Sequence, residues 1–525
     1  GIATIHNIGK SFQGRDLLVL EVTNRETGAG LSKPGFWIDG NLHASEVMGA
    51  AVTLHNIDTL VKGYGNDPFI TDLIDTRVIY LMPKLNPDGS EHYLTKPDGM
   101  RSSVRPHDSD RDGSFDEDPG EDLNGDRNLT QMRIRDPEGN MRTSPDDPRL
   151  MVRVSEGEQG EWRTMSEGID NDGDGRVNED GVGGLDINRN WPSRWQQEYI
   201  QGGAGPYPLS EPETRSVAEF ILAHPNITGL INHHMAGNFV YRPPTNRNFD
   251  VGTGEEIPMP AADEANFAYL GRKYTEVING QEVTPVFGRS GPPLYGAIWG
   301  VMIGWAYDHV GIYSWVPEMG SLVPFCDYDG DGNVSETERM RWNDSDWDGR
   351  LFVDWQPFNH PVLGEVEIGG WVSKVWMPEF GSYTNTMCAP GAVFEDFLQK
   401  HTEWNLWLVA QSPLVRIADL KVEAIDSGFF KVTAAVVNQG YLPTNVTEQA
   451  IRNRMAGSVE VSLSLDGADL VMGDAVTDIG HLQGNGRRTA TMEWMVKTTG
   501  GRAPTVTITV TSVRGGTDSR EVVLR

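Results

Sequence analysis

Short apolar segments alternate with a helical pattern over the first ninety residues, and this alternation constrains the fold more than any other feature of the sequence. Residues 17–23, 35–39 and 77–82 are brief runs of apolar and β-branched side chains, which predict buried strands. Residues 50–62 repeat apolar side chains at the spacing of a helix. Strands that alternate with helices indicate an α/β fold, with a mostly parallel or mixed sheet covered by helices on both faces.

Two segments interrupt this pattern before it resumes. Residues 106–183 and 321–357 are rich in Asp, Gly, Asn and Pro, a composition typical of loops. Helix and strand patterns return at 211–232, and a last helix is predicted at 392–411. We therefore expect one α/β domain over residues 1–413 that carries both segments as insertions.

The character of the sequence changes near residue 414. Runs with period-two alternation, separated by Gly and Asn turns, occupy 430–437, 458–465, 489–496 and 505–513. Several short strands with such spacing predict a β-sandwich. We expect an immunoglobulin-like sandwich over 414–525, an accessory domain in which the sequence places no chemistry.

The formal net charge of −31 is distributed unevenly. Residues 415–525 hold equal numbers of basic and acidic side chains, so the excess lies in the α/β domain, chiefly in its insertions. Such a chain is a poor partner for nucleic acid, because phosphate binding needs basic surface. We also expect no membrane span, no signal peptide at Gly1 and at most one disulfide, between Cys326 and Cys388.

Four acidic loops in the insertions share the frame Asp-x-Asp-x-Asp-Gly. Alternating carboxylates on a tight loop converge on one point, and the glycine permits the sharp turn, an arrangement that suits calcium. Only the third loop has a glutamate, Glu338, at its twelfth position. Solvated acidic turns are the alternative, but four copies, with no evident pairs of flanking helices, favour structural calcium. The other candidate ligands are Asp108, Asp110, Asp112, Asp170, Asp172, Asp174, Asp327, Asp329, Asp331, Asp344, Asp346 and Asp348.

A different pair of metal-ligand types follows the predicted strand 35–39. His43 and Glu46 lie three residues apart, and a strand that leads into a turn can aim both side chains at one ion. Zinc accepts imidazole nitrogen and carboxylate oxygen, and a catalytic zinc has three protein ligands and a water. The pair alone is weak support, because such residues are more often structural.

Five blocks together resemble the zinc carboxypeptidases of the carboxypeptidase A/B type. The resemblance covers about residues 1–410 apart from the insertions, and the family fold that it implies is a mixed eight-stranded sheet between helices. The blocks, in the order of that family, are Gly-Asn-Leu-His-Ala-Ser-Glu (40–46), Asn-Pro-Asp-Gly (86–89), Asp-Ile-Asn-Arg-Asn-Trp (186–191), the segment 234–244 from His-Met-Ala-Gly to Arg-Pro-Pro, and the segment 304–318 that ends in Val-Pro-Glu.

The resemblance implies roles for residues of these blocks. His43, Glu46 and His234 would bind one catalytic zinc, with the adjacent His233 as the competitor for the third position. Glu318 would be the general base, which takes a proton from water and passes it to the leaving amine. Arg101 matches the arginine that polarises the scissile carbonyl, although Met100 stands where the family usually has Trp. Arg105 is the alternative to Arg101.

Four further residues would bind the substrate. Asn188 and Arg189 match the pair that holds the terminal carboxylate, which a planar guanidinium can bind through two parallel hydrogen bonds. Tyr295 matches the tyrosine that caps the substrate. Ile303 falls where the family sets side-chain preference, and an apolar residue there implies apolar or aromatic C-terminal residues.

The sequence therefore predicts a zinc metallocarboxypeptidase that acts on peptides or proteins with a free C-terminus and is stabilised by calcium. One alternative is a zinc peptidase or amidase of the same fold that acts on peptidoglycan stem peptides. Another is a catalytically inactive, calcium-stabilised binding or adhesion protein. Loops that lack a glutamate at the twelfth position should bind calcium weakly, and calcium is plentiful outside cells. Together with the few cysteines, this favours a secreted, extracellular or periplasmic protein of bacterial origin.

Overall fold

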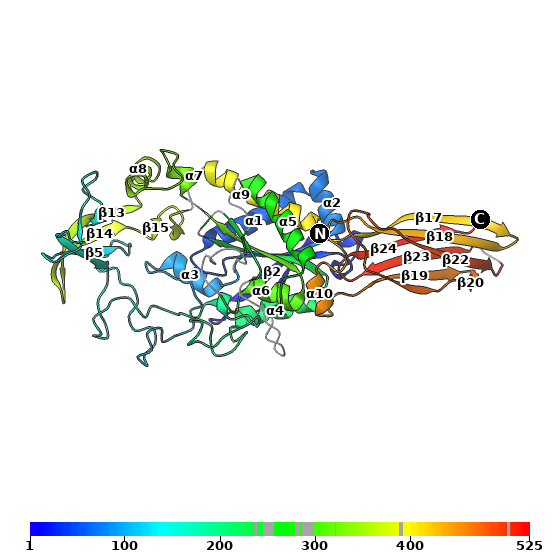
Figure 1. Ribbon diagram of the computed structural model, residues 1–525, viewed down its shortest axis with the longest axis horizontal. Helices are drawn as coiled ribbons and strands as arrows, with labels where there is room; N and C mark the ends of the chain where they lie inside the picture. The colour runs from blue at the N-terminus through cyan, green and yellow to red at the C-terminus, as the bar shows by residue number, and fades with distance from the viewer. Residues whose placement is uncertain are drawn as a thin grey trace.

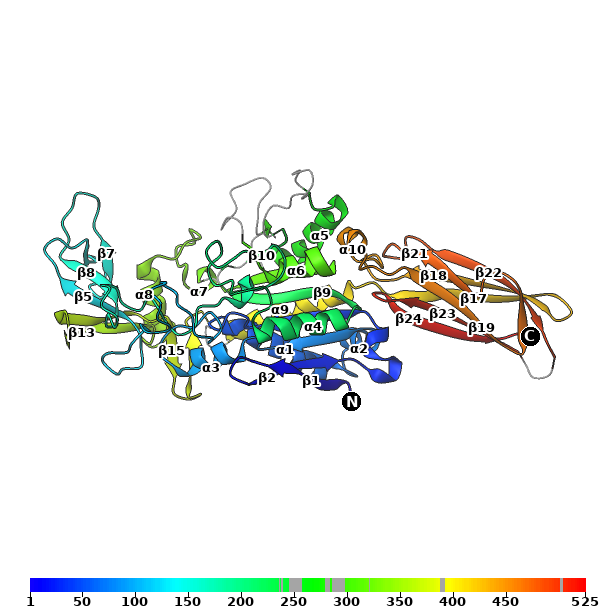
Figure 2. The ribbon, with the colours of Figure 1, turned by 90° about the horizontal axis from the view of Figure 1, so that it is seen from below.

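A computed structural model describes residues 1–235, 237, 239–244, 257–278, 284–285, 298–320, 322–387, 392–500 and 504–525. The molecule is elongated (Figure 1). The α/β domain occupies the middle of the long axis, the two insertions lie together at one end, and the C-terminal β-rich region lies at the other (Figure 2).

A mixed sheet forms the centre of the α/β domain and has eight strands among the described residues, which confirms the predicted sheet. Its central strands run parallel, with β3 between β4 and β9, and β9 next to β12. In spatial order the strands are β1 (Ala3–Lys10), β2 (Asp16–Val22), β4 (Val78–Met82), β3 (Gly35–Gly40), β9 (Ile227–Met235), β12 (Tyr313–Met319), β10 (Phe239–Arg242) and β11 (Thr284–Pro285).

Helices cover both faces of this sheet and so bury its central strands on both sides. The larger group of helices packs on the sheet face that includes Phe36 and Ile38, and the smaller group of helices packs on the face that includes Trp37. The first face carries α1 (Val47–Gly63), α2 (Pro68–Thr76), α5 (Ala261–Ile278) and α9 (Ala392–Ala410). The second face carries α4 (Pro212–Ala223) and α6 (Met302–Trp305) (Figure 1).

Short elements complete the domain. Helix α3 (Pro87–Thr95) follows β4, and single turns form at η1 (Arg25–Thr27), η2 (Gly30–Ser32), η3 (Ile187–Arg189) and the π-helical η4 (Ala306–Val310). Within the described part of the chain, every helix is too short or too polar to cross a membrane.

The two insertions form one lobe, which the sequence did not predict. Strand β14 pairs with β5 and so joins the insertions into a six-stranded sheet. The second insertion continues past residue 357, through β16. The strands of the lobe are β5 (Gln131–Arg135), β6 (Met141–Thr143), β7 (Met151–Arg153), β8 (Trp162–Ser166), β13 (Phe352–His360), β14 (Gly364–Trp371), β15 (Lys374–Met377) and β16 (Ser382–Asn385), and its helices are α7 (Val323–Cys326) and α8 (Glu336–Asp346).

The C-terminal region consists of two four-stranded antiparallel sheets around one apolar core. The buried guanidinium of Arg514 joins it to the α/β domain, donating to the backbone oxygens of Val310 (2.7 Å) and Gly311 (2.9 Å). The first sheet has β17 (Val415–Asp426), β18 (Phe429–Asn438), β22 (Ala490–Thr498) and β20 (Ala468–Met472); the second has β21 (Val476–Gly480), β19 (Val459–Asp466), β23 (Thr505–Ser512) and β24 (Gly516–Val523), and α10 (Glu448–Arg452) lies near η4.

Candidate active site

The turn between β3 and α1 places His43 and Glu46. Strand β3 is buried along its whole length, and Glu46 is the N-cap residue of α1. The turn is tight because a glycine lies at each side of it. A Cβ atom on Gly40 would lie 2.3 Å from the carbonyl carbon of Gly49, so only glycine lets the strand end this close to the helix. The side chains of His43 and Glu46 are buried, and both contact His234 near the carboxyl end of β9.

The neighbouring strands β9 and β12 bring two more predicted residues to this edge. His234 lies near the end of β9, and Glu318 is its direct partner in the parallel ladder with β12. The carboxyl ends of parallel strands meet at one edge of a sheet, which is where ligands bind in open α/β sheets. The site therefore lies at the carboxyl edge of the parallel strands in the centre of the sheet.

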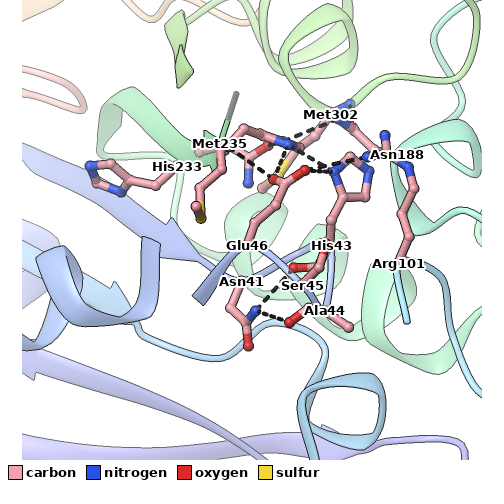
Figure 3. Close-up of polar contacts among 12 residues, drawn as sticks. Asn41, His43, Ala44, Ser45, Glu46, Arg101, Asn188, His233, Met235 and Met302 are labelled. Atoms are coloured by element: carbon pink, nitrogen blue, oxygen red, sulfur yellow. Dashed lines mark hydrogen bonds and ion pairs between the residues drawn. The ribbon is translucent and has the colours of Figure 1, made fainter. Parts of the chain in front are cut away.

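His43, Glu46 and His234 form a compact group of metal-ligand atoms. Figure 3 shows His43 and Glu46 of this group side by side. Nδ1 of His43 lies 2.8 Å from Oε1 of Glu46 and 3.0 Å from Nδ1 of His234. Nδ1 of His234 lies 2.8 Å from Oε2 of Glu46. Two imidazole nitrogens and a carboxylate that converge in this way suit a catalytic zinc, which leaves a further position for water.

The outward nitrogens of both rings have oxygen partners that orient them. Nε2 of His43 lies 3.0 Å from Oδ1 of Asp186, and Nε2 of His234 lies 2.6 Å from Oδ1 of Asn232. With the proton of each ring on Nε2, both Nδ1 lone pairs face the group. Histidines that bind metals are usually held by such an outer carboxylate or carbonyl oxygen. Sequence reasoning missed Asp186 and Asn232 in this role, although Asp186 begins one of the five blocks that resemble the carboxypeptidase family.

Asp186→Asn should weaken zinc binding by about 10- to 100-fold, because the amide no longer holds His43 in the metal-binding tautomer. Competition with a chromogenic zinc chelator measures this affinity. Asp88→Asn is the control, since Asp88 is a buried aspartate that accepts from Ser11 and Arg15 outside the site. Equal zinc affinity of the Asp186 variant and the control would contradict the orienting role.

His233 lies apart from this group, on the other face of β9 (Figure 3). Its Nδ1 contacts the backbone oxygen of Asp39 at 2.8 Å, and its Nε2 contacts Nδ2 of Asn405 at 3.1 Å. Burial lowers the pKa of His233 to about 4, so the ring is neutral at physiological pH. The geometry thus favours His234 over His233 as the third ligand.

Arg101 lies beside the metal-ligand group, and Arg105 does not. Arg101 contacts Oε1 of Glu46 and Oδ2 of Asp186, each at 3.3 Å, and half of its side chain remains exposed (52%). Arg105 instead pairs with Glu211 at 2.9 Å and stacks on the ring of Phe12. Of the two arginines, only Arg101 lines the same cavity as His43 and Glu46.

Asn188 and Arg189 lie in η3, directly after Asp186. The backbone N–H of Met302 donates to Oδ1 of Asn188 (3.0 Å), which fixes the orientation of that amide, and Nδ2 of Asn188 lies 3.3 Å from Nε2 of His234. Arg189 donates to the backbone oxygen of Asn188 (2.8 Å). Asn188 therefore contacts the metal-ligand group, and Arg189 lies next to Asn188 in the same turn and lines the same cavity.

One cavity of about 500 Å³ connects these residues. Its lining combines apolar side chains, Ile303 among them, with Glu318 and the metal-ligand group. Sequence reasoning missed several residues that line the cavity. Tyr295, predicted to cap the substrate, lies outside the described residues. The cavity is lined by His43, Glu46, Arg101, Asn188, Arg189, Ile200, Gln201, His234, Met235, Tyr241, Ile298, Trp299, Val301, Ile303, Val316 and Glu318.

The environment of Glu318 suits a proton acceptor. Burial and the nearby carboxylate of Glu46 raise the pKa of Glu318 well above its usual value, and Arg101 and Arg189 oppose this rise. A carboxylate with a raised pKa is a better base near neutral pH.

The acidic loops differ in what the structure brings together. Asp327, Asp329 and Glu338 form one group of possible metal ligands, and Asp331 does not belong to it. Asp331 accepts from the backbone N–H of Asn333 in its own loop. Contrary to the expectation of loops without flanking helices, α7 precedes this loop and α8 follows it. The first two loops meet and form joint groups of carboxylates.

The fourth predicted loop is not a loop at its start. Asp344 and Asp346 belong to α8, so their side chains leave the helix in different directions, and Asp344 pairs with Arg149 at 2.8 Å. Asp348 follows the end of the helix. Among the described residues, none of these three aspartates belongs to a group that could hold a metal.

Comparison with known proteins gives two family matches. A family model described as zinc carboxypeptidase matches residues 1–322. A second model, a domain of unknown function, matches residues 414–523.

Individual relatives match over shorter segments. Carboxypeptidase M of Mus musculus is 45% identical over 106 residues, which is 20% of this chain and 23% of the relative. Carboxypeptidase D of Mus musculus is 39% identical over 90 residues, 17% of this chain and 6% of the relative. The crystal structure of thrombin activatable fibrinolysis inhibitor aligns with 61% of this chain and 63% of that chain, at 20% identity and a TM-score of 0.36.

Proposed function

The chain belongs to the zinc carboxypeptidase family, and from this we propose that it removes residues from the free carboxyl end of peptides. One observation carries the proposal: the metal-ligand group, the buried Glu318 and the Asn188–Arg189 pair line a single cavity. A base beside a metal site makes a hydrolase, and a carboxylate-binding pair beside both selects the end of a peptide.

The residues fit a zinc ion, because His43, Glu46 and His234 offer three ligand atoms within 4.8 Å of one another. A zinc ion held there would act as a Lewis acid and lower the pKa of water. Glu318 accepts the proton of the attacking water and then gives it to the leaving amine. The guanidinium of Arg101 donates to the oxygen of the scissile carbonyl as negative charge develops on it.

Asn188 and Arg189 determine where the substrate is cut. The Arg189 guanidinium, with the Asn188 amide, binds the terminal carboxylate through charge-assisted hydrogen bonds. Because both residues sit in one short turn, the carboxylate is held at a fixed distance from the metal site. Only the last peptide bond then reaches Glu318.

The apolar residues that line the cavity support a preference for apolar or aromatic C-terminal residues. Ile303, Val301 and Val316 offer no carboxylate to a basic side chain. We expect kcat/KM for a peptide that ends in Phe or Leu to exceed that for the same peptide ending in Lys by at least about 10-fold, since unpaired burial of a charge is costly. A peptide series that differs only in its last residue measures this ratio, and a ratio near one would contradict the role of Ile303.

Mass spectrometry of peptide pairs with free and amidated C-termini tests the reaction itself. The zinc-loaded protein should shorten the free peptides residue by residue, leave the amidated ones intact, and stop in the presence of o-phenanthroline. Internal cuts, or equal cleavage of both forms, would refute a carboxypeptidase and favour the peptidoglycan or amidase alternative. No cleavage, with zinc bound, would favour the inactive alternative.

Two further parts of the proposal concern calcium and domain organisation. The group of Asp327, Asp329 and Glu338 suits one structural calcium ion, which is abundant outside cells and so favours a secreted protein. Residues 1–413 act as the catalytic domain and 414–525 as an accessory β-domain, a division that the separate family match at 414–523 supports.

A further inference from the structure

The loops 108–118 and 170–180 lie side by side and exchange equivalent contacts. Asp180 of the second loop accepts from the backbone N–H groups of Ser109 (3.0 Å) and Asp116 (3.1 Å) in the first. Asp118 of the first loop accepts from the side chain of Asn171 (2.8 Å) and the backbone N–H of Asn178 (3.1 Å) in the second. The two loops are therefore related by approximate twofold symmetry, although 51 residues separate them in the sequence.

The carboxylates of the paired loops form three groups. One consists of Asp108, Asp110 and Asp180, and the other two interlock. Asp110, Asp112 and Glu117 of the first loop meet Asp172 of the second. In the equivalent group, Asp172 and two further carboxylates of the second loop, Asp174 and Glu179, meet Asp110 of the first. Asp110 and Asp172 thus belong to both groups, and each group contains ligands from both loops.

Glu117 and Glu179 provide an independent indication of a bound cation. Both oxygens of each carboxylate are buried and have no hydrogen-bond partner among the described residues. Buried carboxylates without donors are unfavourable unless a cation neutralises them.

We propose that the paired loops form one binuclear calcium site, in which Asp110 and Asp172 bridge the two ions and Glu117 and Glu179 each complete the shell of one. Calcium suits this site because it takes six to eight oxygen ligands in flexible geometry, whereas magnesium requires a strict octahedron and retains water. The inference deepens the calcium part of the proposed function, but it is tested by counting ions and does not depend on hydrolysis.

The position of the site gives it a structural role near the cavity. Oδ1 of Asp116 accepts from the backbone N–H groups of His107 (3.1 Å) and Gly183 (3.0 Å), which are the two ends of the first insertion. The chain between those ends and the cavity is short, with Arg101 on one side and Asp186 on the other. Bound calcium therefore fixes the insertion where it leaves the cavity wall.

Calcium counting with Asp172→Asn tests the bridge. Zinc-loaded protein is freed of calcium with EGTA and titrated with CaCl₂ in a calorimeter. The variant should bind two fewer ions than the wild type at a concentration that saturates the wild type, because Asp172 belongs to both groups. Loss of one ion would mean that the loops bind independently, and no loss would mean that they bind no calcium; either result overturns the proposal.

Asp329→Asn is the matched control, since Asp329 belongs to the separate group with Asp327 and Glu338. It should lose one ion at most and leave the paired site intact. Zinc content and near-ultraviolet circular dichroism establish that each variant is folded.

Glu117→Gln combined with Glu179→Gln tests the proposal through stability. Without calcium, this variant should unfold at a higher temperature than the wild type, because two buried uncompensated charges are removed. With saturating calcium the order should reverse, since only the wild type gains stability from the ions. The same order under both conditions would contradict a cation at these glutamates.

Discussion

Glu318→Gln is expected to lower kcat by about 10²- to 10⁴-fold while the protein retains its zinc. The amide has nearly the same shape as the carboxylate but cannot accept a proton. The metal ligands are unaffected, because Glu318 lies on β12 and the ligands come from the β3–α1 turn and β9. Initial rates on a peptide with a free C-terminus, with zinc measured by elemental analysis on the same sample, test both halves of the prediction.

Glu403→Gln serves as the control, because Glu403 is an exposed glutamate on α9 outside the cavity. It should keep wild-type kcat and zinc content. If Glu318→Gln retained activity close to that of this control, the general base would have to be another residue.

Arg189→Ala should produce the second large effect, and the effect should depend on the substrate. For a peptide with a free carboxylate, kcat/KM should fall by about 30- to 4,000-fold, which corresponds to the about 2–5 kcal/mol lost when one partner of a buried, hydrogen-bonded charge pair is removed. For the amidated peptide, the residual rate should change little, because there is no carboxylate to bind.

Arg189→Lys separates charge from geometry, since lysine keeps the charge but not the planar pair of donors. Its kcat/KM should fall between those of the wild type and the alanine variant. Arg135→Ala is the control, because Arg135 is an exposed arginine of the lobe that the two insertions form (71% side-chain exposure). A similar decrease for free and amidated peptides in Arg189→Ala would contradict a role in binding the terminal carboxylate.

The sequence predicted the elements that carry the site, because their patterns are local. The buried run at 35–39 became β3, and the helical spacing at 50–62 lies within α1. His43, Glu46 and Arg101 then follow from motifs next to these elements. The choice of His234 over His233 stays a prediction; of the two, His234 lies in the group with His43 and Glu46, because alternate residues of β9 face opposite sides.

Other features depend on contacts between distant segments and could not be predicted. The lobe that the two insertions form is built from strands of three to nine residues. The hydrogen bond from Arg133 to Glu367 within it joins positions 234 residues apart. Glu117 and Glu179 were overlooked because each is unremarkable within its own loop and becomes a candidate ligand only when the loops meet. Asp344 matched the loop frame, but a capping box of Ser335 and Glu338 starts α8, which continues through it.

The pairing of β9 with β12 fixes the separation between His234 and Glu318. To move Glu318 along the sheet, β12 would have to slip in register, and a slip of one residue would turn this side chain to the opposite face. The loops and insertions around the cavity are not held by the register of these two strands. Evolution, or a protein engineer, can therefore lengthen or exchange the loops and insertions around the cavity to change specificity, while the spacing that proton transfer requires is inherited unchanged from the sheet.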